Sequence, residues 1–212
     1  MNFSDFKKKV PNLTTLKLGG LAAQFTLAPA LRLGYDAAMI QANRPKKAAV
    51  LALFYPDEKQ NTRFVLTERA SYKGTHSAQI SFPGGKIEQG DLNLEHTAKR
   101  ETFEEIGIPH SEIQIIRELT DVYIPPSNFL ATPFLGYTLQ KPAFKTNREV
   151  ASTIEVLLDD LLNEQSISSI EITTSYMKKV KVPCFKLNDY IVWGATAMML
   201  AEIKNLLIES KF

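Results

Sequence analysis

The hydrophobic pattern is strongest in the eight consecutive apolar residues from Ala48 to Tyr55. Pro45 precedes this run and Pro56-Asp57 follows it, so both of its ends carry a breaking signal. A short apolar run between such signals is typical of a strand that is buried on both faces. The polar residues 57–62 lead into the segment 63–69, which we predict to return as the partner strand of a β-hairpin.

Further strand patterns recur along the chain and alternate with helical ones. We predict a short strand at 79–82, a strand or strand pair at 113–122, a strand at 129–139, a strand passing into a helix at 149–162, a hairpin of strands 170–174 and 180–187, and a closing apolar helix at 193–207.

One central helix is more sharply patterned than the others. Asp91 is a good N-cap residue, and Gly107 with Pro109 beyond it is a typical helix end. We therefore predict a helix from about Asp91 to Gly107, entered through a Gly84-Gly85 turn and an acidic loop. A 3.6-residue period separates a packing face from a polar face. The packing face holds Leu94, Ala98, Thr102 and Ile106, and the polar face holds Thr97, Arg100, Glu101, Glu104 and Glu105.

The first 45 residues are predicted to be a helical and irregular extension that packs on the core formed by residues 46–212. Phe3, Phe6, Val10 and Leu13 follow a roughly helical spacing, although Pro11 interrupts it. A lid, a dimer contact and packing over the sheet are all compatible with this extension, so a homodimer stays open. Mixed strands with one strong central helix and a terminal helix predict an α/β or α+β fold, with helices on both faces of a mixed sheet.

Composition narrows the function classes. A formal charge of +2 over 212 residues is too small to favour a nucleic-acid or membrane surface. Cys184 is the single cysteine, so one chain can form neither a disulfide nor a cysteine-based zinc site. The N-terminus lacks an apolar signal segment and no run approaches the length of a membrane span. These features predict a cytoplasmic protein.

The polar face of the central helix carries the candidate chemistry. Glu101, Glu104 and Glu105 lie within one turn, where like charges repel by about 0.2–0.5 kcal/mol per pair. A bound Mg²⁺ or Mn²⁺ would reverse the sign of this interaction, because these cations prefer carboxylate oxygens. The alternative is an ordinary solvated acidic face.

The stretch 84–108 resembles the Nudix box, in which a glycine precedes Arg-Glu-apolar-x-Glu-Glu-x-Gly-apolar. The matching residues are Gly85, Arg100, Glu101, Glu104, Glu105, Gly107 and Ile108. Two departures are present: the approach to Arg100 is one residue longer, with Asp91 where the loop glutamate belongs, and Thr102 replaces an aliphatic residue.

This resemblance implies an α-β-α sandwich and a pyrophosphate-hydrolysing enzyme that uses Mg²⁺ or Mn²⁺. By the same resemblance Glu101 and Glu105 are the expected principal metal ligands, Glu104 binds directly or through water, and the Gly85 carbonyl completes the shell. The catalytic group comprises Glu104, Glu105 and Arg100, with Arg100 orienting the glutamates. Which carboxylate acts as general base stays open.

A second motif upstream resembles the signature of the coenzyme A pyrophosphatase branch of that family. Leu66, Thr67, Arg69, Ala70 and 82–85 match, whereas Gly74 and Ala78 replace its second arginine and its glycine. The resemblance implies cleavage of coenzyme A or an acyl-coenzyme A to 4′-phosphopantetheine and adenosine 3′,5′-bisphosphate. The expected substrate-binding residues are Arg69, Lys73, His76 and Tyr123. ADP-ribose, a dinucleotide or another nucleotide is the alternative substrate, and a non-catalytic nucleotide-binding module is the alternative function.

Overall fold

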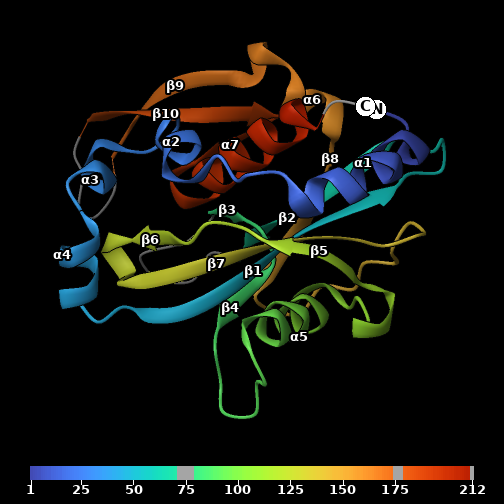
Figure 1. Ribbon diagram of the computed structural model, residues 1–212, viewed down its shortest axis with the longest axis horizontal. Helices are drawn as coiled ribbons and strands as arrows, with labels where there is room; N and C mark the ends of the chain where they lie inside the picture. Colours follow the sequence, from blue (N-terminus) through green and yellow to red (C-terminus); the bar gives the residue numbers. More distant parts are fainter. Residues whose placement is uncertain (71–78, 174–178, 211–212) are drawn as a thin grey trace.

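The computed structural model describes residues 1–70, 79–173 and 179–210 (Figure 1). The elements in chain order are α1 Phe3–Thr15, α2 Gly20–Phe25, α3 Ala30–Leu33, α4 Ala37–Ala42, β1 Lys46–Pro56, β2 Thr62–Arg69, β3 Ile80–Ser81, β4 Gly84–Lys86, α5 Leu94–Ile106, η1 His110–Glu112, β5 Gln114–Glu118, β6 Val122–Ile124, η2 Pro125–Ser127, β7 Phe129–Tyr137, β8 Val150–Leu157, α6 Leu158–Leu162, η3 Glu164–Ser166, β9 Ile167–Ile172, β10 Val180–Leu187, β11 Tyr190–Trp193 and α7 Gly194–Glu209.

The long strand β1 organises the main, mixed sheet. It runs parallel to β7 over its first nine residues, with Lys46 opposite Phe129 and Phe54 opposite Tyr137. On its other edge it pairs antiparallel with two different strands, first β4 and then β2. The main path of the sheet is β3-β2-β1-β7-β5, while β9, β10 and β11 form a separate three-stranded sheet.

Helices cover both faces of the main sheet, as Figure 1 shows with α5 on one side and α1 and α7 on the other. Alternate residues of β1 enter the two cores: Leu51 and Leu53 pack with Ala98 and Ile106 of α5, whereas Phe54 packs with α1 and α7 residues. The predicted strand with two buried faces is therefore confirmed. The mixed α+β sandwich expected from the sequence is confirmed as well.

The N-terminal residues lie on the face of the sheet opposite α5. Phe3 and Phe6 of α1 are buried, and Phe6 stacks on Phe54 with ring centroids 5.2 Å apart. Pro11 is accommodated within α1. A fully buried carboxylate on α7, that of Glu202, accepts hydrogen bonds from Gly20, Gln24 and Thr120, joining the extension to the terminal helix. The division into domains at residue 45 stays a prediction.

Three local predictions were wrong or incomplete. Gly84-Gly85 is not a turn: it begins β4, because Gly84 and Gly85 pair with Val50 and Ala49 of β1. The central helix starts at Leu94 and not near Asp91, since Asn93 caps it by accepting from the His96 N–H at 2.8 Å. The short strand β11 was not predicted. β11 pairs with β10 across a tight turn, so the strand depends on residues on both sides of that turn and not on its own four residues alone.

Other local predictions were correct. Gly107 ends α5 in the left-handed conformation, with φ +79°. The passage from β8 into α6 and the β9–β10 hairpin are present. None of the helices in the described parts of the chain is long and apolar enough to cross a membrane.

The β1–β2 turn is fixed by one buried carboxylate. Asp57 accepts from the N–H groups of Lys59 and Asn61 at 2.9 and 2.8 Å, from the Asn61 amide at 3.1 Å and from Arg63 Nε at 3.0 Å. Burial alone would raise the pKa of the Asp57 carboxyl, but the hydrogen bonds from Asn61, Arg63 and Lys59 lower it from 3.8 to about 2. The same turn receives the start of α1, because the Phe3 N–H donates to the Gln60 carbonyl at 2.8 Å.

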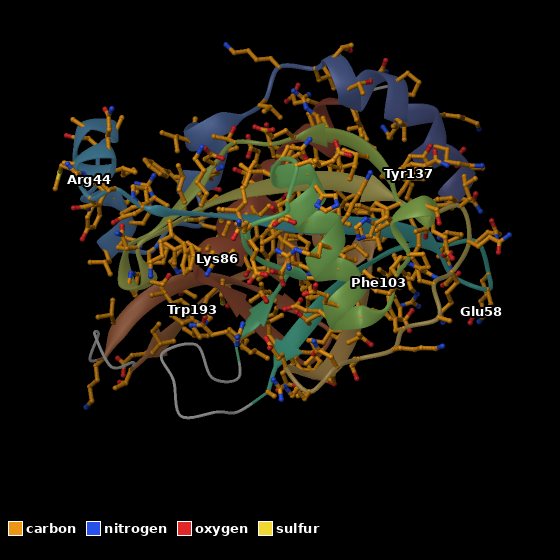
Figure 2. The ribbon with its side chains drawn as sticks, turned by 90° about the horizontal axis from the view of Figure 1, so that it is seen from below. Arg44, Glu58, Lys86, Phe103, Tyr137 and Trp193 are labelled. Carbon is orange, nitrogen blue, oxygen red and sulfur yellow. The ribbon has the colours of Figure 1, made fainter. Side chains whose placement is uncertain are left out.

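We expect Asp57→Asn to lower the free energy of unfolding by about 2 kcal/mol at pH 7. The pKa is lower in the folded protein than in the unfolded chain, so the contribution is complete above about pH 4. It is lost as the pH falls toward about 2. Denaturant unfolding at pH 7, 4 and 2.5 should show a difference between wild type and variant that shrinks with acidity. Glu58→Gln is the matched control, because Glu58, labelled in Figure 2, lies in the same turn, is exposed and forms a surface ion pair with Lys141 at 2.9 Å. A pH-independent difference would contradict the assignment.

Candidate active site

The site is built where β4 passes between β1 and α5. The Gly84 N–H donates to Glu105 Oε2 at 3.1 Å, so the buried end of the acidic face is hydrogen-bonded to the strand. A Cβ atom at Gly85 would lie 2.5 Å from the Glu101 carboxylate, which shows how closely that carboxylate lies against the backbone. The two glycines therefore face the Glu101 and Glu105 side chains of α5 directly.

Glu101 and Glu105 occupy an environment that disfavours two negative charges. Glu105 is 8% exposed, and its burial raises the pKa of its carboxyl to about 7 despite the hydrogen bond from Gly84. The charge on Glu101 raises the pKa of Glu105 further. Burial also raises the pKa of Glu101, and the neighbouring Arg100 opposes this shift. Two desolvated carboxylates with raised pKa values attract either a proton or a cation.

Arg100 lies at the centre of the acidic face. Its Nη1 donates to Glu101 Oε1 at 2.9 Å and to Glu104 Oε2 at 3.2 Å, while Nη2 donates to the Lys86 carbonyl at 3.1 Å. These contacts hold the guanidinium between β4 and α5, and Figure 2 views the helix from this side with Lys86 labelled. Arg100 thus fixes the orientation of two carboxylates without occupying the cavity itself.

Asp91 anchors Arg100, a role that the sequence analysis missed. Its carboxylate accepts from Arg100 Nε and Nη2, both at 2.9 Å, from Thr97 Oγ1 at 2.9 Å and from the Glu88 N–H at 2.9 Å, and it pairs with His96 Nδ1 at 3.0 Å. The hydrogen bonds from Arg100 lower the pKa of Asp91 well below its usual range. The sequence carried a signal for this role, because Asp91 occupies the loop position at which the family pattern has a glutamate.

Thr102 explains how the second departure from the family pattern is tolerated. Its side chain is buried on the packing face of α5, where an aliphatic residue was expected. Its hydroxyl donates to the Ala98 carbonyl at 2.7 Å, which satisfies the polar group within the helix. The substitution leaves the acidic face unchanged.

A cavity of about 570 Å³ opens beside these carboxylates. The residues that line it are Ala48, Val50, Arg69, Ala70, Gln79, Ser81, Gly84, Gly85, Lys86, Glu101, Glu105, Ile124, Ser127, Phe129, Ala131 and Glu149. The structure therefore brings the predicted Arg69 to the same cavity as Glu101, Glu105 and Gly85. Glu149 lies there too, with an oxygen 3.7 Å from Arg69 Nη2. The cavity thus joins an acidic wall to a half-exposed guanidinium.

The other predicted substrate residues have different outcomes. Lys73 and His76 lie outside the described residues. Tyr123 is 3% exposed and does not line the cavity beside the carboxylates. Its hydroxyl accepts from Asn43 and donates to Asn128 at 3.0 and 3.1 Å. The ring lines a smaller cavity next to the first one, and its role in substrate binding stays a prediction.

The donor set suits a hard divalent cation, and Glu104 is its most exposed member. Within the described segments, no three His, Cys, Asp or Glu side chains are gathered so that they could hold one ion. The ion pairs of Arg100 with Glu101 and Glu104 account for this, because they hold both carboxylates against the guanidinium. Glu101 and Glu105 nevertheless flank the same Gly84-Gly85 backbone with carboxylate oxygens, and Mg²⁺ commonly takes one or two carboxylates plus water and phosphate oxygens. The residues present therefore fit such an ion.

Comparisons with known proteins identify a family. The NUDIX domain model matches residues 45–166. Nudix hydrolase 22, chloroplastic, and Nudix hydrolase 15, mitochondrial, both from Arabidopsis thaliana, are 32% and 30% identical over 74% and 78% of this chain. The chain spans only 54% and 60% of the length of these two relatives. The Nudix hydrolase NudL of Yersinia pestis (strain Pestoides F) is 30% identical over 66% of this chain and 69% of its own length.

Solved structures show the same fold at low sequence identity. The Nudix hydrolase RenU of M. smegmatis has a TM-score of 0.55 and 16% identity over 79% of this chain and 89% of that chain. A C. elegans Ap4A hydrolase binary complex has a TM-score of 0.52 and 19% identity over 79% of this chain and 99% of that chain. These likenesses support the mixed-sheet architecture and carry no information on the substrate.

Proposed function

Since the chain belongs to the NUDIX domain family, we propose that it hydrolyses the pyrophosphate of a nucleoside-diphosphate derivative with the help of Mg²⁺ or Mn²⁺. The observation that carries this proposal is the convergence of Glu101 and Glu105 on the Gly84-Gly85 strand at the wall of the 570 Å³ cavity. A solvated acidic helix would have no reason to bury Glu105 against a backbone amide.

The ion would be held by Glu101 and Glu105, with the Gly85 carbonyl and Glu104 as further ligands, Glu104 directly or through water. A bound ion of this kind neutralises phosphate charge and lowers the pKa of bound water. The carboxylates lie on a helix packed against the sheet, so their positions are set before substrate arrives. The hydrogen bonds of Arg100 with Asp91 and with the backbone of β4 fix the position of the acidic face of α5 relative to β4.

The proton of the attacking water needs a carboxylate acceptor, and Glu104 and Glu105 are the candidates on α5. Glu104 is half-exposed and hydrogen-bonded to Arg100, whereas Glu105 is buried and hydrogen-bonded to Gly84. Glu149 lies near Arg69, with its Oε2 3.7 Å from Arg69 Nη2. Arg69 is the group on the cavity wall best suited to contact phosphate oxygens of the substrate.

We propose coenzyme A or an acyl-coenzyme A as the substrate, with water adding across the pyrophosphate to release 4′-phosphopantetheine and adenosine 3′,5′-bisphosphate. The support is the resemblance of residues 66–85 to the coenzyme A branch together with the position of Arg69 beside the carboxylates. ADP-ribose or a dinucleotide is the second candidate, because Gly74 replaces an arginine of that signature.

The test is turnover of coenzyme A, acetyl-coenzyme A, ADP-ribose and NADH, each with Mg²⁺, with Mn²⁺ and with a chelator. We expect metal-dependent release of 4′-phosphopantetheine from coenzyme A, with kcat/KM at least about tenfold above that for ADP-ribose. Products are separated by ion-pair chromatography and identified by mass. Metal-dependent cleavage of another substrate would keep the chemistry and reject the coenzyme A assignment. Nucleotide binding without any turnover would favour the non-catalytic module.

A further inference from the structure

A buried arginine in the N-terminal segment lies among aromatic side chains. Arg32 lies on α3 and is 4% exposed. Its Nη1 donates to the Tyr35 carbonyl at 2.9 Å, and its guanidinium lies 5.2 Å from the Phe25 ring and 6.0 Å from the Tyr123 ring. Among the residues that the structure describes, no carboxylate pairs with it and its enclosed Nε has no hydrogen-bond partner.

Such a placement is unfavourable unless something compensates for it. Arginine stays charged in proteins, and a buried charge without a counter-ion loses solvation that aromatic rings replace only in part. Burial lowers the pKa of Arg32, which reflects the same loss of solvation. By contrast, Arg100 is held by three carboxylates, so this chain satisfies a part-buried guanidinium elsewhere.

Arg32 lines a cavity of about 160 Å³ with mostly apolar walls. On the order of ten waters fit such a space, which is also enough for a phosphate group and part of a sugar. The walls come from four parts of the chain: Pro29 to Arg32, the strand residues Ile80 and Ser81, the loop Tyr123 to Pro126, and the start of α7.

The start of α7 adds a second positive feature to this cavity. Gly194, Ala195 and Thr196 line it, and Trp193 at the N-cap position, labelled in Figure 2, makes no side-chain capping bond. The first N–H groups of a helix lack intrahelical acceptors and carry partial positive charge. A sixteen-residue helix and the Arg32 guanidinium, which has no carboxylate partner among the described residues, thus border the same small space.

The small cavity adjoins the candidate active site. Gln79, Ser81 and Ile124 line both the 160 Å³ cavity and the 570 Å³ cavity. A ligand whose pyrophosphate lies at Glu101 and Glu105 can therefore extend past these residues toward Arg32.

We propose that the Arg32 cavity is a subsite for a phosphate monoester that the substrate carries outside its scissile pyrophosphate. The monoester oxygens would accept from the Arg32 guanidinium and from the N–H groups that begin α7. This inference rests on the proposed hydrolase function. Through Arg32, the N-terminal extension would therefore select substrates that carry a third phosphate.

The decisive comparison is coenzyme A against 3′-dephospho-coenzyme A, which differ by one monoester. We expect wild type to prefer coenzyme A by about 10–100-fold in kcat/KM, the usual range for a charged hydrogen-bonded group. Arg32→Met should remove most of this preference while changing kcat/KM for the dephospho substrate less than about threefold. Arg32→Lys should retain part of it, because lysine keeps the charge and loses the forked donor geometry.

Arg117→Met is the matched control. Arg117 also contacts the N-terminal segment, since its Nη1 donates to the carbonyls of Leu13 at 2.9 Å and Leu16 at 2.6 Å, but it lines neither cavity. Its replacement should leave the substrate ratio unchanged. An equal loss on both substrates in Arg32→Met, with Tm lowered as in Arg117→Met, would assign Arg32 a structural role and overturn the proposal.

A binding measurement keeps the subsite testable if coenzyme A is not hydrolysed. Isothermal titration of the wild-type protein with Mg²⁺ should show about tenfold tighter binding of adenosine 3′,5′-bisphosphate than of AMP. Arg32→Met should bind both nucleotides equally. Equal affinity for the two nucleotides in wild type would reject the subsite, whereas absent turnover with this difference intact would reject only the proposed reaction.

Discussion

Replacement of Glu105 by glutamine is expected to reduce metal-dependent turnover by at least about 1,000-fold without loss of the fold. Glutamine preserves the size of the side chain and an oxygen that can accept from the Gly84 N–H, so the contact between α5 and β4 survives. It removes the negative charge that the cation requires. The measurement is kcat for the best substrate with Mg²⁺ and with Mn²⁺, at protein concentrations high enough to detect residual activity.

Stability separates this loss from unfolding. Glu105 is buried near Glu101, and burial raises the pKa of its carboxyl to about 7, so the metal-free protein gains nothing from its charge. The Tm of metal-free Glu105→Gln should therefore equal or exceed that of wild type. Added Mg²⁺ should raise the Tm of wild type, because a ligand that binds only the folded state stabilises it, and should have little effect on the variant.

Glu95→Gln is the control for the helix as a whole. Glu95 lies in the first turn of α5, is half-exposed and pairs with Lys99 at 2.8 Å. Its replacement should change neither turnover nor the Mg²⁺ response. Retention of more than about a tenth of wild-type activity in Glu105→Gln would contradict the proposed metal site and favour a solvated acidic face.

The second large effect is expected from replacing either of the two glycines of β4 by alanine. One replacement should impair catalysis and the other should impair folding. In Gly85→Ala the new methyl group would lie 2.5 Å from the Glu101 carboxylate, the mobile end of a side chain. Glu101 can rotate away, so we expect little change in stability and a loss of about 100-fold or more in kcat, the scale set by a displacement of about 1 Å.

Gly84→Ala should instead damage the fold. Gly84 has φ +155°, and a Cβ atom there would lie 2.4 Å from the Ala49 carbonyl oxygen and 2.6 Å from Val50 Cα. These are backbone atoms of β1 and cannot move alone. We expect a loss of at least about 2–4 kcal/mol in the free energy of unfolding.

Paired measurements of kcat and chemical denaturation distinguish the two variants. Gly90→Ala serves as a control for replacing a left-handed glycine, because Gly90 has φ +108° and a Cβ there would meet nothing within 4 Å. It should cost a modest amount of stability and leave kcat within a few-fold of wild type. A fully active Gly85→Ala would show that Glu101 need not remain against the strand.

The sequence by itself determined the local elements whose signals are short-range. Ala48–Tyr55 is apolar at every position and lies between two breaking signals, which predicted a strand buried on both faces, and Gly107 ended α5 because glycine adopts the left-handed conformation at little cost. The spacing of Arg100, Glu101, Glu104 and Glu105 placed them on one helical face, which established the family and the acidic character of the site.

Tertiary structure alone decided which of these residues meet. The Gly84-Gly85 pair resembles a turn in sequence, but becomes a strand because β1 leaves its edge free for pairing there. Asp91 resembles a helix cap, but Asn93 takes that role and leaves the Asp91 carboxylate for Arg100. The sequence does not predict the burial of Tyr123, which depends on contacts from Asn43 and Arg32, about 80 to 90 positions away in the chain. A sequence pattern shows the periodicity of a segment and the local conformation that its residues favour. Burial and strand pairing depend on distant segments that only the folded chain brings together.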